Sequence, residues 1–202
     1  MLLGLDFDNT LISYDKLFRQ VALEKAWIPE TTAAEKNAVR DHLRAIGKED
    51  DWTRLQGEVY GGRILEAEPY EGMQAALKQL CARDIAMRIV SHKTRTPYLG
   101  PAWDLHAAAR GWLTQQGFHD LQGLAWSPEQ VFFELSKEAK IARIVTLGCT
   151  HYIDDLPEIL EMLPEHIEKI YFAPNDIAAA AARPAWRVMR SWRELPTLLS
   201  LR

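Results

Sequence analysis

The first residues suited to chemistry are two aspartates that follow an apolar run at the start of the chain. Asp6 and Asp8 stand two apart in the segment Asp6-Phe7-Asp8-Asn9-Thr10. Side chains two apart in a strand point to the same face, and like charges that close repel unless a cation lies between them. Mg²⁺ held by carboxylates and a backbone carbonyl would remove that cost. The alternative is a strand-end turn in which Asp8 or Asn9 caps the next segment.

A second acidic pair, Asp154-Asp155, follows another apolar run. Two acidic pairs at the ends of two parallel strands would face one crevice, and that arrangement favours a metal site. The alternative makes Asp155 the N-cap of a helix that has Pro157 in its first turn. That alternative explains Asp155 better than it explains Asp154.

Groups suited to an anion occur at two further places. Ser91 follows a hydrophobic run, where its hydroxyl and nearby backbone N–H groups could hold an anion. Lys140 lies near the start of an expected helix and could supply a point charge to phosphate and to a carboxylate. Each has an ordinary structural alternative, a turn serine and a solvated lysine. Lys93 could touch a substrate, but we expect it to face solvent in a loop.

The spacing of apolar residues predicts the elements that must bring these groups together. Five short apolar runs are expected to be strands: residues 2–7, 85–90, 130–133, 150–153 and 169–172. Segments with helical spacing lie between them, and in one of these Met73, Ala76, Leu77 and Leu80 form an apolar stripe. Alternating strands and helices imply right-handed crossovers and an α/β fold, a Rossmann-like parallel sheet sandwiched by helices. Ligands of such sheets bind at the carboxyl ends of the strands.

Residues 14–68 interrupt this alternation. The segment contains no convincing strand, and its apolar residues recur at roughly helical spacing. We interpret it as a small helical insertion, so that residues 1–13 and 69–202 form the α/β core. Gly57 to Gly62 has the glycine spacing of a P-loop but lacks the Lys-Ser/Thr that must follow, so we expect a hinge or turn there. The alanine run at 178–182 is expected to be helical.

Composition excludes several classes of protein. The chain has 202 residues, and 24 Lys and Arg against 28 Asp and Glu give a formal net charge of −4. We therefore expect no nucleic-acid partner, and no apolar run is long enough to span a membrane. The two cysteines form no CxxC pair, which makes a reducing cytoplasm the expected compartment. Acids interrupt the first apolar run, so we do not expect it to be a signal peptide.

Taken together, the motifs resemble those of the haloacid dehalogenase (HAD) superfamily of phosphotransfer enzymes. The resemblance rests on the pattern DxDxT at Asp6 to Thr10, Ser91 after a hydrophobic strand, Lys140, and the acidic pair Asp154-Asp155. The order and rough spacing of these motifs match the family over most of the chain outside the insertion. Lys137 is the alternative to Lys140 as the motif lysine. Asn9 stands where many relatives have glycine, at a position that varies.

The resemblance implies a phosphatase mechanism. Asp6 would be the nucleophile and would form an aspartyl-phosphate, and Asp8 would be the general acid and then the base. The presence of Asp8 favours phosphoryl chemistry, because family members that act on carbon–halogen bonds lack that acid. Ser91 and Lys140 would hold phosphate oxygens.

The resemblance also implies a magnesium cofactor. The carboxylates of Asp6 and Asp154 and the carbonyl of Asp8 would bind Mg²⁺. Asp155 would support the site through the metal's water shell or by orienting Lys140. Thr10 would steady the loop by hydrogen bonding.

Residues 14–68 fall where this family places a helical cap, which excludes water and selects the leaving group. Trp27, Trp52, Arg54 and Tyr60 are candidates for substrate contact, with cap core and solvated surface as the alternatives. The expected substrate is a small phosphorylated metabolite, with a sugar phosphate as one candidate, and the expected protein is a monomer or homodimer. Two other functions stay open: a phosphotransferase or mutase of the same superfamily, and a non-catalytic regulatory protein that keeps the fold.

Overall fold

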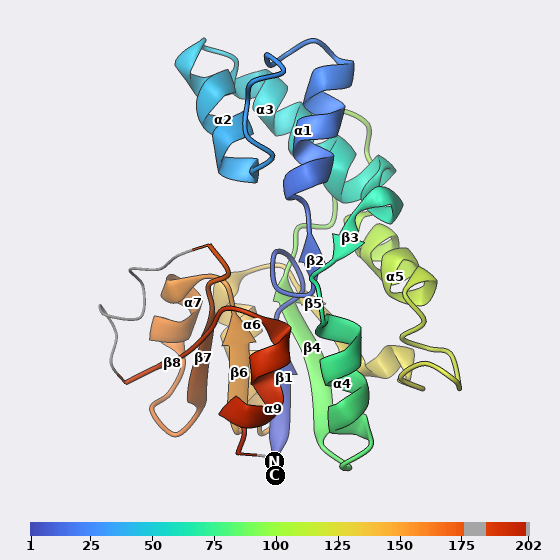
Figure 1. Ribbon diagram of the computed structural model, residues 1–202, viewed down its shortest axis with the longest axis vertical. Helices are drawn as coiled ribbons and strands as arrows, with labels where there is room; N and C mark the ends of the chain where they lie inside the picture. The colour runs from blue at the N-terminus through green and yellow to red at the C-terminus, as the bar shows by residue number, and fades with distance from the viewer. Residues whose placement is uncertain (176–184, 201–202) are drawn as a thin grey trace. The chain divides into compact units, whose positions relative to one another are not determined.

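The computed structural model describes residues 1–175 and 185–200 (Figure 1). Its main feature is a six-stranded sheet with the strand order β5-β4-β1-β6-β7-β8, and every neighbouring pair is parallel. The strands are β1 (Leu2–Leu5), β4 (Ala86–His92), β5 (Val131–Glu134), β6 (His151–Asp154), β7 (Glu168–Phe172) and β8 (Arg187–Met189). The predicted Rossmann-like α/β class is confirmed.

The register of the central strands brings the carboxyl ends of three of them together. Leu5 at the end of β1 pairs with Ile89 of β4 on one side and with Ile153 of β6 on the other. The N–H of Asp6 then donates to the carbonyl of Ile153 at 2.9 Å, so the β1–β6 ladder continues into the first acidic motif. The motif residues therefore lie at one edge of the sheet, where ligands of parallel sheets bind.

Helices flank this sheet and bury its apolar side chains. They are α4 (Met73–Cys81), α6 (Lys137–Thr146), α7 (Pro157–Met162) and α9 (Leu195–Leu198). The predicted stripe of α4 is buried, and Ile144 of α6 joins Ile159 and Leu160 of α7 in one hydrophobic cluster. Burial of such side chains against the sheet is the main source of the stability of this layer.

The described chain divides into two compact units, which we call the sheet unit and the helical unit. The sheet unit comprises residues 1–12, 69–93 and 117–202, and the helical unit comprises residues 13–68 and 94–116. The helical unit contains α1 (Asp15–Glu24), α2 (Lys36–Ala45), α3 (Glu49–Gly57), α5 (Leu105–Gln115), a π-helical turn at Glu58–Gly62 and a 3-10 turn at Ile64–Glu66.

Residues 94–116 were predicted to belong to the core, but they pack with residues 13–68. The indole N–H of Trp112 in α5 donates to the carbonyl of Ala67 at 2.8 Å, and the amide of Gln115 donates to Leu65 at 3.0 Å. Trp112 is fully buried there. The amphipathic pattern of α5 predicts a buried face but does not indicate which unit supplies the partner.

The two ends of the segment 57–68 differ from what the sequence predicts. Glu68 belongs to a short strand, β3 (Glu68–Pro69), which pairs with β2 (Ile12–Ser13). A strand of two residues is too short to show a period in the sequence, so the pattern of residues 14–68 does not predict it. Gly57 to Gly62, predicted as a hinge or turn, forms the end of α3 and the π-helical turn.

The interior of the helical unit is aromatic. Phe18 is fully buried and packs against Trp52, whose ring centroid lies 5.0 Å away, and Tyr60 makes an edge-to-face contact with Phe18 at 5.5 Å. Trp52 therefore belongs to the core of this unit. Arg54 is exposed and forms an ion pair with Asp51 at 3.2 Å.

Two observations concern the limits of the described chain. The predicted helix at 178–182 falls outside the described residues. Within residues 1–175 and 185–200, none of the helices combines the length and the apolar content that crossing a bilayer would require.

Candidate active site

Asp6 lies directly after β1 and is almost completely buried, with 4% of its surface exposed. Its Oδ1 accepts hydrogen bonds from the hydroxyl of Ser91 at 2.8 Å and from the ammonium group of Lys140 at 2.6 Å. The hydroxyl of Thr10 approaches the other oxygen at 3.4 Å. Donors from three segments far apart in sequence thus fix the orientation of this carboxylate.

Neither Ser91 nor Thr10 is exposed to solvent. Ser91 was expected just after its strand, but β4 continues through His92, so Ser91 lies within the strand and is buried. Thr10 is also fully buried, and its carbonyl accepts a hydrogen bond from the indole of Trp192 at 3.0 Å. The loop after β1 is therefore tied to the body of the sheet unit.

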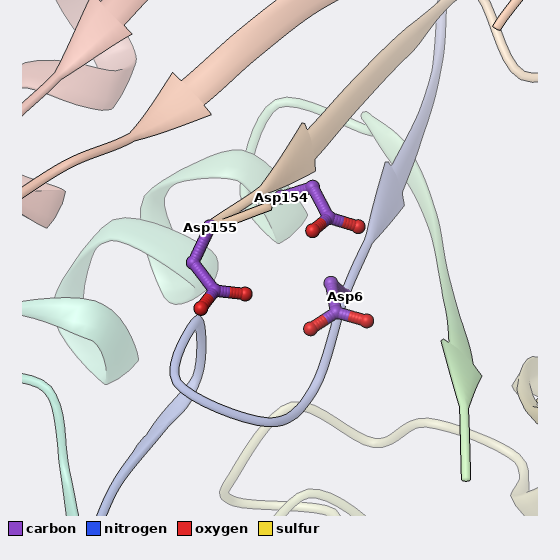
Figure 2. Close-up of side chains that lie close together, drawn as sticks. All are labelled: Asp6, Asp154 and Asp155. Atoms are coloured by element: carbon purple, nitrogen blue, oxygen red, sulfur yellow. The ribbon is translucent and has the colours of Figure 1, made fainter. Parts of the chain in front are cut away.

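Asp154 and Asp155 approach Asp6 from the neighbouring strand β6. Figure 2 shows both carboxylates at the end of β6, directed toward that of Asp6. One oxygen from each of the three residues can be chosen so that all lie within 4.8 Å of one another. Asp154 is fully buried and Asp155 is half-buried. The two predicted acidic motifs do meet at one edge of the sheet.

Asp155 is not the N-cap of α7. The helix begins at Pro157 with Leu156 as its N-cap, and the N–H of Leu156 donates to Oδ1 of Asp154 at 2.8 Å. Asp154 therefore stabilises the turn into α7 through Oδ1 and accepts a hydrogen bond from Lys140 through Oδ2. Pro157 at the first helical position agrees with the sequence pattern.

Lys140 bridges the two acidic motifs. Its ammonium group donates to Oδ1 of Asp6 and to Oδ2 of Asp154, both at 2.6 Å, and its side chain is 2% exposed. It lies on the inward face of α6 with Ile144, one turn later, and the hydroxyl of Ser136 caps the helix by accepting from Ala139 at 3.1 Å. Lys137 instead lies at the surface and pairs with Glu158.

Burial and charge act in opposite directions on this triad. Burial alone would lower the pKa of Lys140, but the neighbouring carboxylates of Asp154 and Asp6 outweigh it and hold that pKa above its usual value. Burial raises the pKa of Asp154 well above its usual range, Lys140 opposes the rise, and Asp6 adds to it. In this cluster a single ammonium group faces the carboxyl groups of Asp6 and Asp154, with that of Asp155 close by.

The donor set fits a hard divalent cation. Three carboxylates converge within a few ångströms, and oxygen ligands of this kind are those that Mg²⁺ prefers. The predicted metal ligands Asp6 and Asp154 belong to this cluster, and Asp155, predicted as a supporting residue, joins it. The excess of negative charge at a buried position is the physical reason for a cation there.

Lys93 is the residue that the sequence interpretation misplaced. It was expected in a loop facing solvent, yet its side chain is 3% exposed and its ammonium group donates to both carboxylate oxygens of Asp8, at 2.9 and 2.8 Å. One signal was available in the sequence: Lys93 stands two residues after Ser91. If the strand runs on past Ser91, both side chains point to the same face.

Fold and site together define an α/β protein with an acidic, lysine-bridged site at the carboxyl edge of a parallel sheet. No protein-family model matches the sequence, and no curated protein matches it. Solved structures match over nearly the whole chain. A HAD family hydrolase from Deinococcus radiodurans R1, with bound phosphate and sodium, has a TM-score of 0.60 at 17% identity and covers 98% of this chain and 94% of its own.

Two further structures give the same picture. A predicted phosphoglycolate phosphatase from Haemophilus somnus 129pt has a TM-score of 0.59 at 15% identity, covering 98% of this chain and 97% of its own. A candidate HAD hydrolase from Bacillus subtilis, bound to magnesium, has a TM-score of 0.54 at 13% identity, covering 99% and 98%. The chain has the fold of the HAD-superfamily hydrolases. The fold that the motifs predicted is therefore confirmed.

Proposed function

We propose that this protein is a Mg²⁺-dependent phosphatase that hydrolyses a small phosphorylated metabolite through an aspartyl-phosphate on Asp6. The observation that carries the proposal is the buried Asp6 carboxylate, oriented by Ser91 and Lys140 beside the acidic pair at the end of β6. A nucleophile needs a fixed orientation toward the reacting atom, and three donors supply it. The bound phosphate in the D. radiodurans neighbour supports a phosphorylated substrate.

In the first step, an oxygen of Asp6 attacks phosphorus while the bond from phosphorus to the leaving oxygen breaks. Asp8 gives its proton to that leaving oxygen, so the product leaves as an alcohol. In the second step, Asp8 takes a proton from water, whose oxygen attacks the same phosphorus. The bond to Asp6 breaks, inorganic phosphate leaves, and both aspartates return to their starting states.

Ser91 and Lys140 would hold the phosphoryl oxygens in both steps. Their donor groups already converge on Oδ1 of Asp6, so they need little rearrangement to reach oxygens on the phosphorus bound there. Thr10 would keep the loop that carries Asp8 in place. All three residues are buried, so their donor groups compete little with bulk water.

The carboxylates of Asp6 and Asp154 and the backbone carbonyl of Asp8 would hold Mg²⁺. Bound there, Mg²⁺ supplies a positive charge that offsets the repulsion between the acidic cluster and an anionic substrate. Asp155 would support the cation through its water shell. The magnesium-bound B. subtilis neighbour is consistent with this cofactor.

The helical unit is our candidate for the cap that selects the leaving group. A sugar phosphate is one substrate to test first, since fold and motif do not fix the substrate. We further propose a cytoplasmic protein, because Cys81 and Cys149 are both unpaired.

The test is hydrolysis of a generic aryl phosphate, followed as release of inorganic phosphate with and without Mg²⁺. We expect activity with Mg²⁺, loss on chelation, and loss of at least about 10³-fold for Asp6→Asn. Asp41→Asn, a change to an exposed aspartate in α2, should leave the rate unchanged. Activity that survives Asp6→Asn would exclude the nucleophile. Product analysis with sugar phosphates separates hydrolysis from transfer to another acceptor, and Mg²⁺ binding without turnover over a broad substrate panel would indicate a non-catalytic protein.

A further inference from the structure

The proposed mechanism gives no role to the ion pair between Lys93, which is buried, and Asp8, which is partly exposed. Lys93 is the last residue of the sheet unit before the chain enters residues 94–116, and its ammonium group contacts both oxygens of Asp8 at 2.9 and 2.8 Å. Nζ also lies 5.6 Å from the centroid of the Phe7 ring. The Lys93 side chain therefore lies against Phe7 and Asp8, next to Asp6 in the sequence.

The backbone of Lys93 is held as firmly as its side chain. Its N–H donates to the carbonyl of Glu134 at 2.8 Å, which extends the β4–β5 ladder one residue beyond the pair His92–Glu134. A long lysine side chain loses much rotamer freedom when it is buried, so an ordered backbone lowers the remaining cost of placing it. Lys93 is thus fixed at both ends.

Residues at the carboxyl end of β4 contact both aspartates of the proposed mechanism. Ser91 and Lys93 stand two apart along extended chain, so their side chains point to the same face. Ser91 donates to Asp6 and Lys93 donates to Asp8. All four residues belong to the sheet unit. The carboxyl end of β4 and the residue that follows it therefore supply one hydroxyl and one ammonium group, each to a different carboxylate.

We propose that Lys93 is a positioning residue that fixes the Asp8 side chain for proton transfer to the leaving oxygen. When Asp8 carries the proton that it gives up, one of its oxygens keeps the hydrogen bond from Lys93 and the other oxygen holds that proton. The inference rests on the proposed function, in which Asp8 gives and accepts that proton. Proton transfer needs heavy atoms within about 2.6–3.2 Å, and a misplacement of about 1 Å can cost about 10²-fold in rate. An aspartate free to rotate would meet this requirement only part of the time, whereas the ammonium group selects one rotamer.

The test compares kcat/KM for two phosphate esters in Lys93→Met. An alkyl phosphate has a poor leaving group that must be protonated, while p-nitrophenyl phosphate releases a stable anion that need not be. We expect Lys93→Met to lower kcat/KM by about 10²-fold for the alkyl ester and by less than about fivefold for the aryl ester. Lys78→Met, a change to an exposed lysine on α4, is the matched control and should alter neither value.

A double mutant separates positioning from a general structural role. If Lys93 acts through Asp8, Lys93→Met should cause little further loss in an Asp8→Asn background. Lys93→Arg keeps the charge and should restore part of the alkyl-ester activity. If Lys93→Met does not fold, Lys93→Gln, which keeps hydrogen-bond donors without the charge, takes its place in both comparisons, with thermal unfolding confirming the fold.

The outcomes distinguish the two proposals. Equal losses on both esters with a raised KM would assign Lys93 to phosphate binding and overturn the positioning role. Losses that add to those of Asp8→Asn would also overturn it. If Asp8→Asn itself shows no dependence on the leaving group, Asp8 is not the acid, and the proposed mechanism fails together with this inference.

Discussion

At the scale of single residues, the charged groups of the site stabilise one another, so the removal of one leaves the others without a partner. Lys140 lies between the carboxylates of Asp6 and Asp154 at 2.6 Å from each, away from water. Removing one partner of a buried ion pair leaves the others unpaired in a medium that stabilises charge poorly. Lys140, which holds phosphate in the proposed mechanism, therefore also stabilises the acidic cluster.

Lys140→Met should accordingly destabilise the protein as well as inactivate it. We expect the free energy of unfolding without divalent cation to fall by about 3–5 kcal/mol, the range found when a buried pair is broken. The measurement is denaturant unfolding followed by circular dichroism in the presence of a chelator. Lys137→Met, on the surface of the same helix, should change stability by less than about 1 kcal/mol. Equal stabilities of the two variants would contradict the ion-pair account.

Most of these residues could be predicted from the sequence, because their positions relative to the expected strands and helices indicate their roles. Asp6, Ser91 and Asp154 were predicted from their position next to an apolar run, and Lys140 from its position near the start of a helix. The structure brings the four together. Lys93 was missed because one residue of extra strand decides whether it is buried. Strand ends are set by hydrogen bonds to a neighbour, here Glu134, and no pattern within the strand itself indicates where they stop.

At the scale of elements, α6 works as the support for Lys140. Its first turn is closed by the Ser136 side chain, and Lys140 and Ile144 form its buried face. An N-cap that is lost frays the first turn, and Lys140 lies at the end of that turn. The cap therefore influences both stability and the position of the bridging ammonium group.

Ser136→Ala should lower the free energy of unfolding by about 1 kcal/mol and lower kcat more than it raises KM. The stability part is measured by denaturant unfolding, and the kinetic part with the aryl phosphate assay. Thr53→Ala in α3 is the comparison and should change neither, because the hydroxyl of this half-buried residue donates to the carbonyl of Glu49 one turn earlier in the same helix. No change in Ser136→Ala would show that Lys140 is held independently of the cap.

Elements were predictable where burial dictates a pattern. The strands β1, β4 and β6 are apolar runs because both faces of a parallel sheet are covered. The three-residue strand β8 has no such run and was not predicted; it is recognised by its pairing with β7, which runs from Arg187 opposite Ile170 to Met189 opposite Phe172. The assignment of α5 failed for a related reason, because its partners at Leu65 and Ala67 are distant in sequence.

At the scale of the whole molecule, a divalent cation bound at the acidic cluster should increase the stability of the folded state. A ligand that binds only the folded state stabilises it by RT ln(1 + [L]/Kd), about 2.7 kcal/mol at a hundredfold excess over Kd. We expect Mg²⁺ to raise the thermal unfolding midpoint of the wild-type chain. Asp154→Asn should abolish this Mg²⁺-dependent shift, while Asp41→Asn should retain it. An undiminished shift in Asp154→Asn would place the cation elsewhere.

The central claim is that Asp6 becomes phosphorylated during turnover, and its most direct test is to detect that phosphate. The protein is mixed with p-nitrophenyl phosphate and Mg²⁺, quenched in acid within one turnover, digested, and examined by mass spectrometry. The account predicts a phosphate on Asp6 in the wild-type chain, a larger fraction in Asp8→Asn because the second step lacks its base, and none in Asp6→Asn. An active enzyme whose Asp6 never carries phosphate, or one that carries it on another residue, would contradict the account.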